Sequence, residues 1–117
     1  MSALLTKTLK YQLLCNWRAN DAAGLDAPDF PPVVKLYTPD AGCVWLLAEL
    51  NPADETTCFG LCDLGLGFPE LGYVSLAELK TVRGRLGLPV ERDPHFRADK
   101  TLSQYAELAT QCGRIVT

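Results

Sequence analysis

Apolar side chains recur every four residues near the N-terminus, which is the spacing of one helix face. The set consists of Leu5, Leu9, Leu13 and Trp17. Thr6 stands at the start of this pattern and has the hydroxyl group that an N-cap residue needs. We therefore expect a helix from Thr6 to about Arg18. A loop should follow from Asn20 to Pro32, because the adjacent Pro31 and Pro32 exclude regular structure.

The middle of the chain alternates short β-rich runs with turn signals. The four runs are Val33–Thr38, Cys43–Leu50, Thr56–Leu64 and Leu71–Val74. Each of the three segments that separate them contains a proline. Because short turns join consecutive strands, we expect an antiparallel meander.

The second of these runs is apolar on both of its expected faces. Strict alternation places Val44, Leu46, Ala48 and Leu50 on one face. It places Cys43, Trp45, Leu47 and Glu49 on the other. A strand that is apolar on both sides is buried on both sides, so we expect it to be central and covered by helices.

Two capping-box patterns mark helix starts in the last third of the chain. Ser75 with Glu78 predicts a helix from Leu76 to about Arg83, which Gly84 or Gly87 would end. Thr101 with Gln104 opens a second helix that reaches about Cys112, with Gly113 as its C-cap.

Leu88–Arg92 lies between these two helices and has the composition of a short strand. Pro89 lacks an amide hydrogen, so the strand belongs at a sheet edge. The predicted order is α-β-β-β-β-α-(β)-α. It describes an α+β fold with a mainly antiparallel sheet of 4–5 strands, packed with three helices, in a single domain over residues 1–117.

Composition places the chain among cytoplasmic proteins. With 117 residues, 48% of them hydrophobic, it can bury a hydrophobic core without the support of disulfide bonds or a structural metal ion. Five cysteines, an odd number, argue against a disulfide framework. No stretch approaches the ~18–20 apolar residues of a membrane span. The segment Met1–Lys10 lacks the basic and apolar regions of a secretory signal.

The sequence offers weak evidence for a metal site. Cys58 and Cys62 would share one face of a strand about 13 Å apart, at ~3.3 Å per residue, which is too far to hold one ion. His95 and Cys112 are distant in sequence. We expect core cysteines, and neither a metal nor a cofactor.

No catalytic constellation is recognisable either. Asp40, with Glu78 and Lys80, superficially matches a metal-dependent nuclease pattern, but Asp40 lies in a predicted turn and Glu78 in a predicted cap. Gly65 and Gly67 do not fit a phosphate-binding loop. His95 has no marked nucleophile beside it. We expect a protein that is not an enzyme; the alternative is a small nuclease that uses Asp40 or Asp63 with a divalent metal ion.

Charge bears on nucleic-acid binding. The net charge is −3, with four basic and seven acidic residues in 1–55 and seven of each in 56–117. A phosphate-binding protein usually has a basic excess. The local alternative is a nucleic-acid contact through four basic residues interleaved with acids. These are Lys80, Arg83, Arg85 and Arg92.

The glycine-punctuated block from Phe59 to Ser75 is a candidate contact surface. Asp63 and Glu70 flank its turn, and Phe68 and Tyr73 lie close to them in sequence. Acidic and aromatic side chains at a rigid turn suit contact with a protein partner. The alternative is that Asp63 stabilises the turn and that the aromatic rings only pack.

Four segments, in order along the chain, carry a resemblance to a known family. They are Leu4–Thr6, Val34–Pro39, Phe59–Leu79 and Leu88–Phe96. From about Leu4 to Tyr105 the chain resembles the family called domain of unknown function 2958. The resemblance implies a small protein carried on plasmids, integrative elements and phages, without an established activity and hence without functional residues to transfer.

Together these observations favour a non-catalytic accessory protein that binds a host protein or ribonucleoprotein complex. The mobile-element setting that the resemblance implies suggests interference with host defence, as an anti-CRISPR or antirestriction factor. The alternatives are nucleic-acid binding through residues 80–100 and a metal-dependent nuclease.

Overall fold

The computed structural model describes residues 4–117; the first three residues, which belong to the segment used for the signal prediction, lie outside it. A short 3₁₀ turn, Gly24–Asp26, follows the first helix. The other elements are α1 (Lys7–Ala23), β1 (Val34–Tyr37), β2 (Val44–Leu50), β3 (Thr57–Asp63), β4 (Glu70–Ser75), α2 (Leu76–Leu79), β5 (Glu91–Arg92) and α3 (Leu102–Cys112). The predicted α+β fold and its element order are confirmed.

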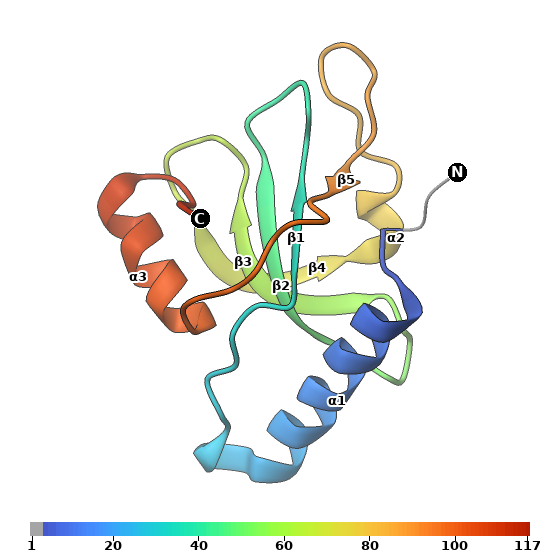
Figure 1. Ribbon diagram of the computed structural model, residues 1–117, viewed down its shortest axis with the longest axis vertical. Coiled ribbons are helices and arrows are strands. Elements are labelled where there is room, and N and C mark those ends of the chain that lie inside the picture. Colours follow the sequence, from blue (N-terminus) through green and yellow to red (C-terminus); the bar gives the residue numbers. More distant parts are fainter. Residues whose placement is uncertain (1–3) are drawn as a thin grey trace.

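The five strands form one antiparallel sheet in the order β4-β3-β2-β1-β5 (Figure 1). The first four strands make the predicted meander. The short β5 pairs with β1 through Leu36 and Arg92 and forms one edge. It is shorter than the predicted strand Leu88–Arg92, and Pro89 lies outside it in an isolated bridge with Arg83. At the other edge lies β4, which has six residues and pairs only with β3.

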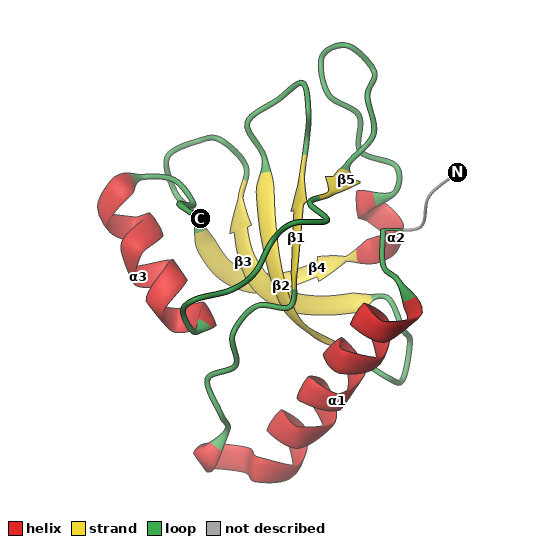
Figure 2. Ribbon diagram, viewed as in Figure 1, coloured by secondary structure: helices red, strands yellow, loops and turns green. Residues whose placement is uncertain are grey.

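Helices cover both faces of the sheet (Figure 2). On one face, α1 and α2 close a cluster that includes Leu13, Leu36, Leu47 and Leu79. On the other, α3 closes a second cluster, whose buried members are Leu46, Ala48, Leu61, Leu102, Tyr105, Ala109 and Ile115. The central position predicted for the second strand is therefore confirmed.

A β-bulge in β2 overturns part of the predicted alternation. The register shifts between Leu47, opposite Gly60, and Glu49, opposite Phe59, so Ala48 is an extra residue. Beyond the bulge the faces exchange. Leu50 therefore joins the α1 cluster instead of the α3 side. Glu49 shares the face of Phe59, which packs against the α3 cluster.

Helix α1 is longer than the sequence pattern predicts, since it continues past Arg18 to Ala23. Contacts with the sheet extend it. The side-chain amide of Asn16 donates to the carbonyl of Ala48 at 2.9 Å, and that of Asn20 donates to Glu49 at 2.8 Å. Helix α1 therefore ends with Gly24 as its C-cap, which has a positive φ of 61°, and the predicted loop begins only after the 3₁₀ turn.

Helix α2 is shorter than predicted and ends at Leu79, well before Gly84 and Gly87. Ser75 caps its first turn as expected by accepting from the amide of Glu78. The chain then folds onto Asp40, whose carboxylate accepts from the amides of Leu86 and Leu88. This contact holds residues 84–88 in a loop instead of another helical turn.

The last helix agrees with its prediction. Thr101 accepts from Gln104 and Gln104 accepts from Thr101, so both bonds of the capping box are present. Gly113 ends α3 in the left-handed conformation. Among residues 4–117, no helix combines the length and the apolar character that crossing a membrane requires.

Candidate binding pocket and open sheet edge

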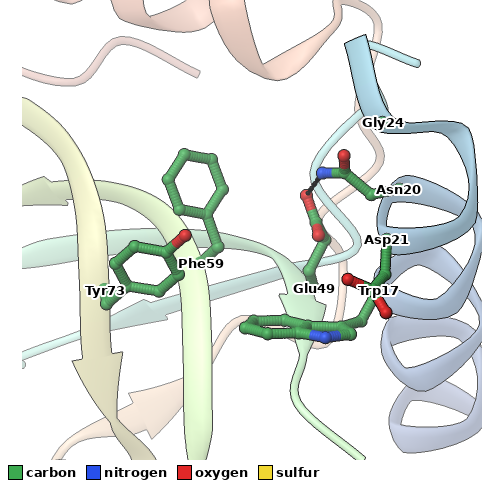
Figure 3. Close-up of a pocket in the computed structure, with 7 residues that line it drawn as sticks. All are labelled: Trp17, Asn20, Asp21, Gly24, Glu49, Phe59 and Tyr73. Carbon is green, nitrogen blue, oxygen red and sulfur yellow. Dashed lines mark hydrogen bonds between the residues drawn. The ribbon is translucent and has the colours of Figure 1, made fainter. Parts of the chain in front are cut away.

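A pocket of about 270 Å³ lies where the C-terminal half of α1 meets β2, β3 and β4 (Figure 3). Its lining comes from four elements and from the glycine that ends α1. The lining residues are Trp17, Asn20, Asp21, Gly24, Glu49, Phe59 and Tyr73. Segments far apart in the sequence therefore build one concave site.

Aromatic rings form one side of this pocket. Phe59 and Tyr73 are direct cross-strand partners, and their rings meet edge to face with centroids 5.2 Å apart. The Trp17 ring reaches them from α1, with its centroid 6.2 Å from that of Tyr73. Figure 3 shows Phe59 and Tyr73 across the gap from Glu49, with Trp17 closing one end.

The opposite side is acidic. Glu49 is only 7% exposed, and burial raises the pKa of its carboxyl group, an effect that the hydrogen bond from Asn20 partly opposes. Asp21 adds a second carboxylate from α1. The bulge at Ala48 turns Glu49 to the same face of the sheet as Phe59. The side-chain amide of Asn16 stabilises the bulge by donating to the carbonyl of Ala48.

The lining of the pocket combines aromatic rings with carboxyl groups. Its titratable side chains are two carboxyl groups and one phenol, beside two non-titratable aromatic rings and one amide. Aromatic faces beside carboxylates suit a ligand with positive charge.

A second feature is the apolar surface along β4 and the loop before it, which we call the edge surface. Five large apolar side chains are exposed here, a concentration that usually marks an interaction site. They are Leu64, Leu66, Phe68, Leu71 and Tyr73. Phe68 and Tyr73, predicted as contact residues, are 78% and 69% exposed, and Glu70 is exposed beside them.

Asp63, the fourth residue of the predicted contact set, does not lie on this surface. It is only 3% exposed. One carboxylate oxygen accepts from the amide of Gly65 at 2.8 Å, and the other accepts from the amide of Ile115 at 3.0 Å. Asp63 thus closes the turn after β3 and ties down the C-terminal segment.

The four predicted nucleic-acid-binding residues differ in their surroundings. Arg83 donates to the carbonyls of Lys80 and Val82, and Arg92 donates to the carbonyl of Leu4 at 2.9 Å. Lys80, Arg83 and Arg85 are exposed, and Arg92 is half-buried. Two of the four side chains therefore already bond to the backbone of this chain.

The nuclease-like residues lie in structural positions. Asp40 holds the 84–88 loop with one oxygen; its other oxygen is buried, with no hydrogen-bond partner in the described part of the chain. A Cβ atom at Gly84 would overlap the Asp40 carboxylate, so a side chain at this position would displace that carboxylate. His95 is exposed, and its amide closes a turn on Asp93.

The cysteine pair lies along β3 as the sequence predicted, and it belongs to the core on the α1 side. Burial raises the pKa of the Cys58 thiol to about 12 and also raises the pKa of Cys62. Within residues 4–117, no group of three histidine, cysteine, aspartate or glutamate side chains is arranged to hold a metal ion.

Sequence reasoning missed most of the pocket. Trp17 was assigned only to the apolar face of a helix, and Asn20 and Asp21 to a loop. One signal was present: Glu49 is the only charged residue in the run Cys43–Leu50. A charge in a strand that is otherwise apolar on both faces requires a local reason.

Comparison with known proteins identifies the family. Searches of curated proteins and of solved structures find no significant match. A family model described as "Protein of unknown function (DUF2958)" matches residues 4–116, nearly the whole chain. That match includes the glycine-punctuated block, the open edge β4 and every residue of the pocket. The chain therefore belongs to the DUF2958 family of proteins of unknown function.

Proposed function

We propose that this protein is a non-catalytic binding module whose edge surface contacts a larger protein. The supporting observation is the coincidence of two features. Strand β4 is an open edge of six residues, and large exposed apolar side chains lie on it and on the loop before it. Soluble proteins usually protect such edges, so one left open and apolar is suited to a partner.

The mode of binding follows from the geometry. An extended segment of the partner adds to β4 as a sixth strand, and main-chain hydrogen bonds supply affinity. Leu71 and Tyr73 alternate along β4, so they share one face and contact alternate side chains of that segment. Phe68 and Leu66 extend the contact beyond the strand. Glu70 supplies polarity at the rim.

We further propose that the partner is a host protein or ribonucleoprotein complex in the cytoplasm. A mobile genetic element gains from a small protein that occupies a surface of a host defence complex. The proposal of a host partner rests on the mobile-element setting that the family resemblance implies. In its specific form, the protein is an anti-CRISPR or antirestriction factor.

The test is affinity capture from host extract, with and without the defence complexes, at physiological salt. Wild type is compared with Phe68→Ser/Leu71→Ser, which removes two exposed apolar side chains of the edge surface that do not line the pocket. The matched control is Leu25→Ser/Leu86→Ser, which changes two exposed apolar residues outside the edge surface. We expect the control to retain the partner and the edge variant to lose it. Failure of wild type to retain any complex would contradict the proposal.

Two alternatives have separate tests. A nucleic-acid-binding protein would show a salt-dependent gel shift that weakens when Arg83, Arg85 and Arg92 are neutralised. A nuclease would cleave DNA or RNA in Mg²⁺ or Mn²⁺, and loss of cleavage in Asp40→Ala or Asp63→Ala would implicate that carboxylate.

A further inference from the structure

We propose that the pocket between α1 and the β2–β3–β4 face binds a cationic group, an alkylammonium or a guanidinium. Lysine and arginine side chains carry such groups, as do small quaternary amines. The inference does not depend on whether β4 pairs with a partner strand, because the pocket is complete within this chain.

The aromatic side provides the first half of the argument. A cation is attracted to the face of an aromatic ring within about 6 Å of its centroid. Here three rings, from Trp17, Phe59 and Tyr73, border one cavity. Two of them are fixed against each other by cross-strand pairing, and the third is carried by a long helix bonded to the sheet through Asn16 and Asn20.

The carboxyl groups of Glu49 and Asp21 also favour a cationic ligand. Glu49 is buried, and a buried carboxylate is stable only when a donor or an opposite charge compensates the lost water. Asn20 supplies one neutral donor to one of its oxygens. Burial still raises the pKa of Glu49, so the neutral donor compensates the charge incompletely. A cation in the pocket would complete this compensation, with Asp21 adding a second negative charge.

The size of the cavity limits the ligand. Pockets for drug-sized molecules usually measure ~300–1,000 Å³, and this one, at about 270 Å³, lies just below that range. It therefore suits the end of a single side chain or a small amine. Tyr73 belongs to both the pocket and the edge surface, so a segment added along β4 would pass beside the pocket opening.

Titration of the ¹⁵N-labelled full chain with small probes tests the proposal. The cationic probes are the N-acetyl methylamides of lysine, trimethyllysine and arginine; the neutral ones are those of norleucine and citrulline. The reporter is the Trp17 indole N–H resonance, and Trp45, which is buried in the core, is the internal reference. We expect cationic probes to shift Trp17 but not Trp45, and to bind about tenfold tighter than their neutral counterparts.

A further arm separates the two sources of the cation. Choline represents a free amine, and an extended peptide with one central arginine represents a protein partner. A peptide that binds tighter than choline, and tighter than the same peptide with citrulline in place of arginine, assigns the cation to a partner side chain. Tighter binding of choline assigns it to a small molecule. Both outcomes support a cation site, and neither requires the host partner of the proposed function.

Variants locate the binding within the pocket. Glu49→Gln keeps an oxygen for Asn20 but removes the charge, and Trp17→Leu removes one ring. We expect each to weaken arginine-probe binding by about tenfold. Tyr73→Ala should also weaken it, whereas Tyr11→Ala should not, although the two tyrosines are 69% and 68% exposed. Equal binding of citrulline and arginine, or no shift of Trp17 in wild type at about 50 mM probe, would overturn the proposal.

Discussion

Gly60 in β3 lies directly opposite Gly72 in β4, yet an added methyl group would clash at only one of them. A Cβ atom on Gly60 would overlap the carbonyl oxygen of Leu46 and lie 2.9 Å from the Cα atom of Leu47. At Gly72 such an atom would meet nothing within 4 Å. The two glycines thus have different roles. Gly60 permits the close packing of β2 on β3, whereas Gly72 lies on the open edge strand, where a side chain would meet no neighbouring atom.

This difference predicts opposite outcomes for two matched substitutions. Gly60→Ala should lower the free energy of unfolding by about 2–3 kcal/mol, because the contacts are with backbone that cannot move aside. Gly72→Ala should be neutral or stabilising by up to about 1 kcal/mol, because alanine reduces the entropy of the unfolded chain. Urea unfolding measures both, and equal losses at the two positions would contradict the packing described.

A second prediction concerns Asp63, which accepts from the buried amide of Ile115. Asp63→Ala leaves that amide without its partner and should lower the free energy of unfolding by about 2 kcal/mol or more. It should also speed hydrogen exchange at Ile115. Asp26→Ala, at an exposed aspartate after α1, is the control and should change little. Equal free energies of unfolding for Asp63→Ala and the control would show that the hydrogen bond between Asp63 and the amide of Ile115 does not stabilise the fold.

Stability should depend on pH through Glu49. Burial raises the pKa of this carboxyl group above its ordinary value of 4.5. The folded protein therefore holds a proton at pH values where the unfolded chain has released it. The contribution of the Glu49 carboxyl group to the free energy of unfolding falls as pH rises from about 4.5 through the pKa of the folded state. Above that pKa the contribution is constant.

Glu49→Gln removes this dependence. The free energy of unfolding of the variant, minus that of wild type, should therefore rise with pH across the same interval and then level off. Urea titrations at several pH values measure the difference, with Glu107→Gln, an exposed position on α3, as the control. A difference that falls with pH would show that Glu49 is stabilised as a carboxylate in the folded protein.

Thiol reactivity provides a fourth prediction. The pKa of Cys58 is raised to about 12, mainly by burial, whereas Cys112 is exposed at the end of α3. Because the thiolate is the reactive form, iodoacetamide near pH 8 should modify Cys112 at least about a hundredfold faster than Cys58. Peptide mass spectrometry measures the two rates. Similar rates would mean that the β3 core opens readily.

Local signals predicted most of the fold. The β-rich runs bounded by proline-containing turns predicted the four strands of the meander. The Thr101 capping box and Gly113 predicted where α3 begins and, approximately, where it ends. These features depend on neighbours in sequence. The bulge at Ala48 does not, because it arises where Asn16 of α1 bonds to its carbonyl. The face of Glu49 was therefore predicted wrongly. The ends of α1 and α2 were also predicted wrongly, because they depend on the distant contacts of Asn20 with Glu49 and of Asp40 with the 84–88 loop.

The difference between local signals and contacts of distant residues also explains which site residues could be predicted. Phe68, Glu70 and Tyr73 lie near a turn that the sequence reveals, and the structure finds all three exposed. The pocket instead joins Trp17 and Asn20 with Glu49 and Phe59, which come together only when α1 packs against the twisted sheet. Contacts over such sequence separations have no local pattern to reveal them.

The edge surface is tested most directly by hydrogen–deuterium exchange of the protein alone and in complex with the partner retained by capture. We predict new protection in Glu70–Ser75 and in the preceding loop, because the partner segment bonds to the open edge of β4. Residues 80–92, which carry the basic side chains, should exchange as they do in the free protein. Protection confined to residues 80–92, with β4 unchanged, would contradict the proposed binding surface.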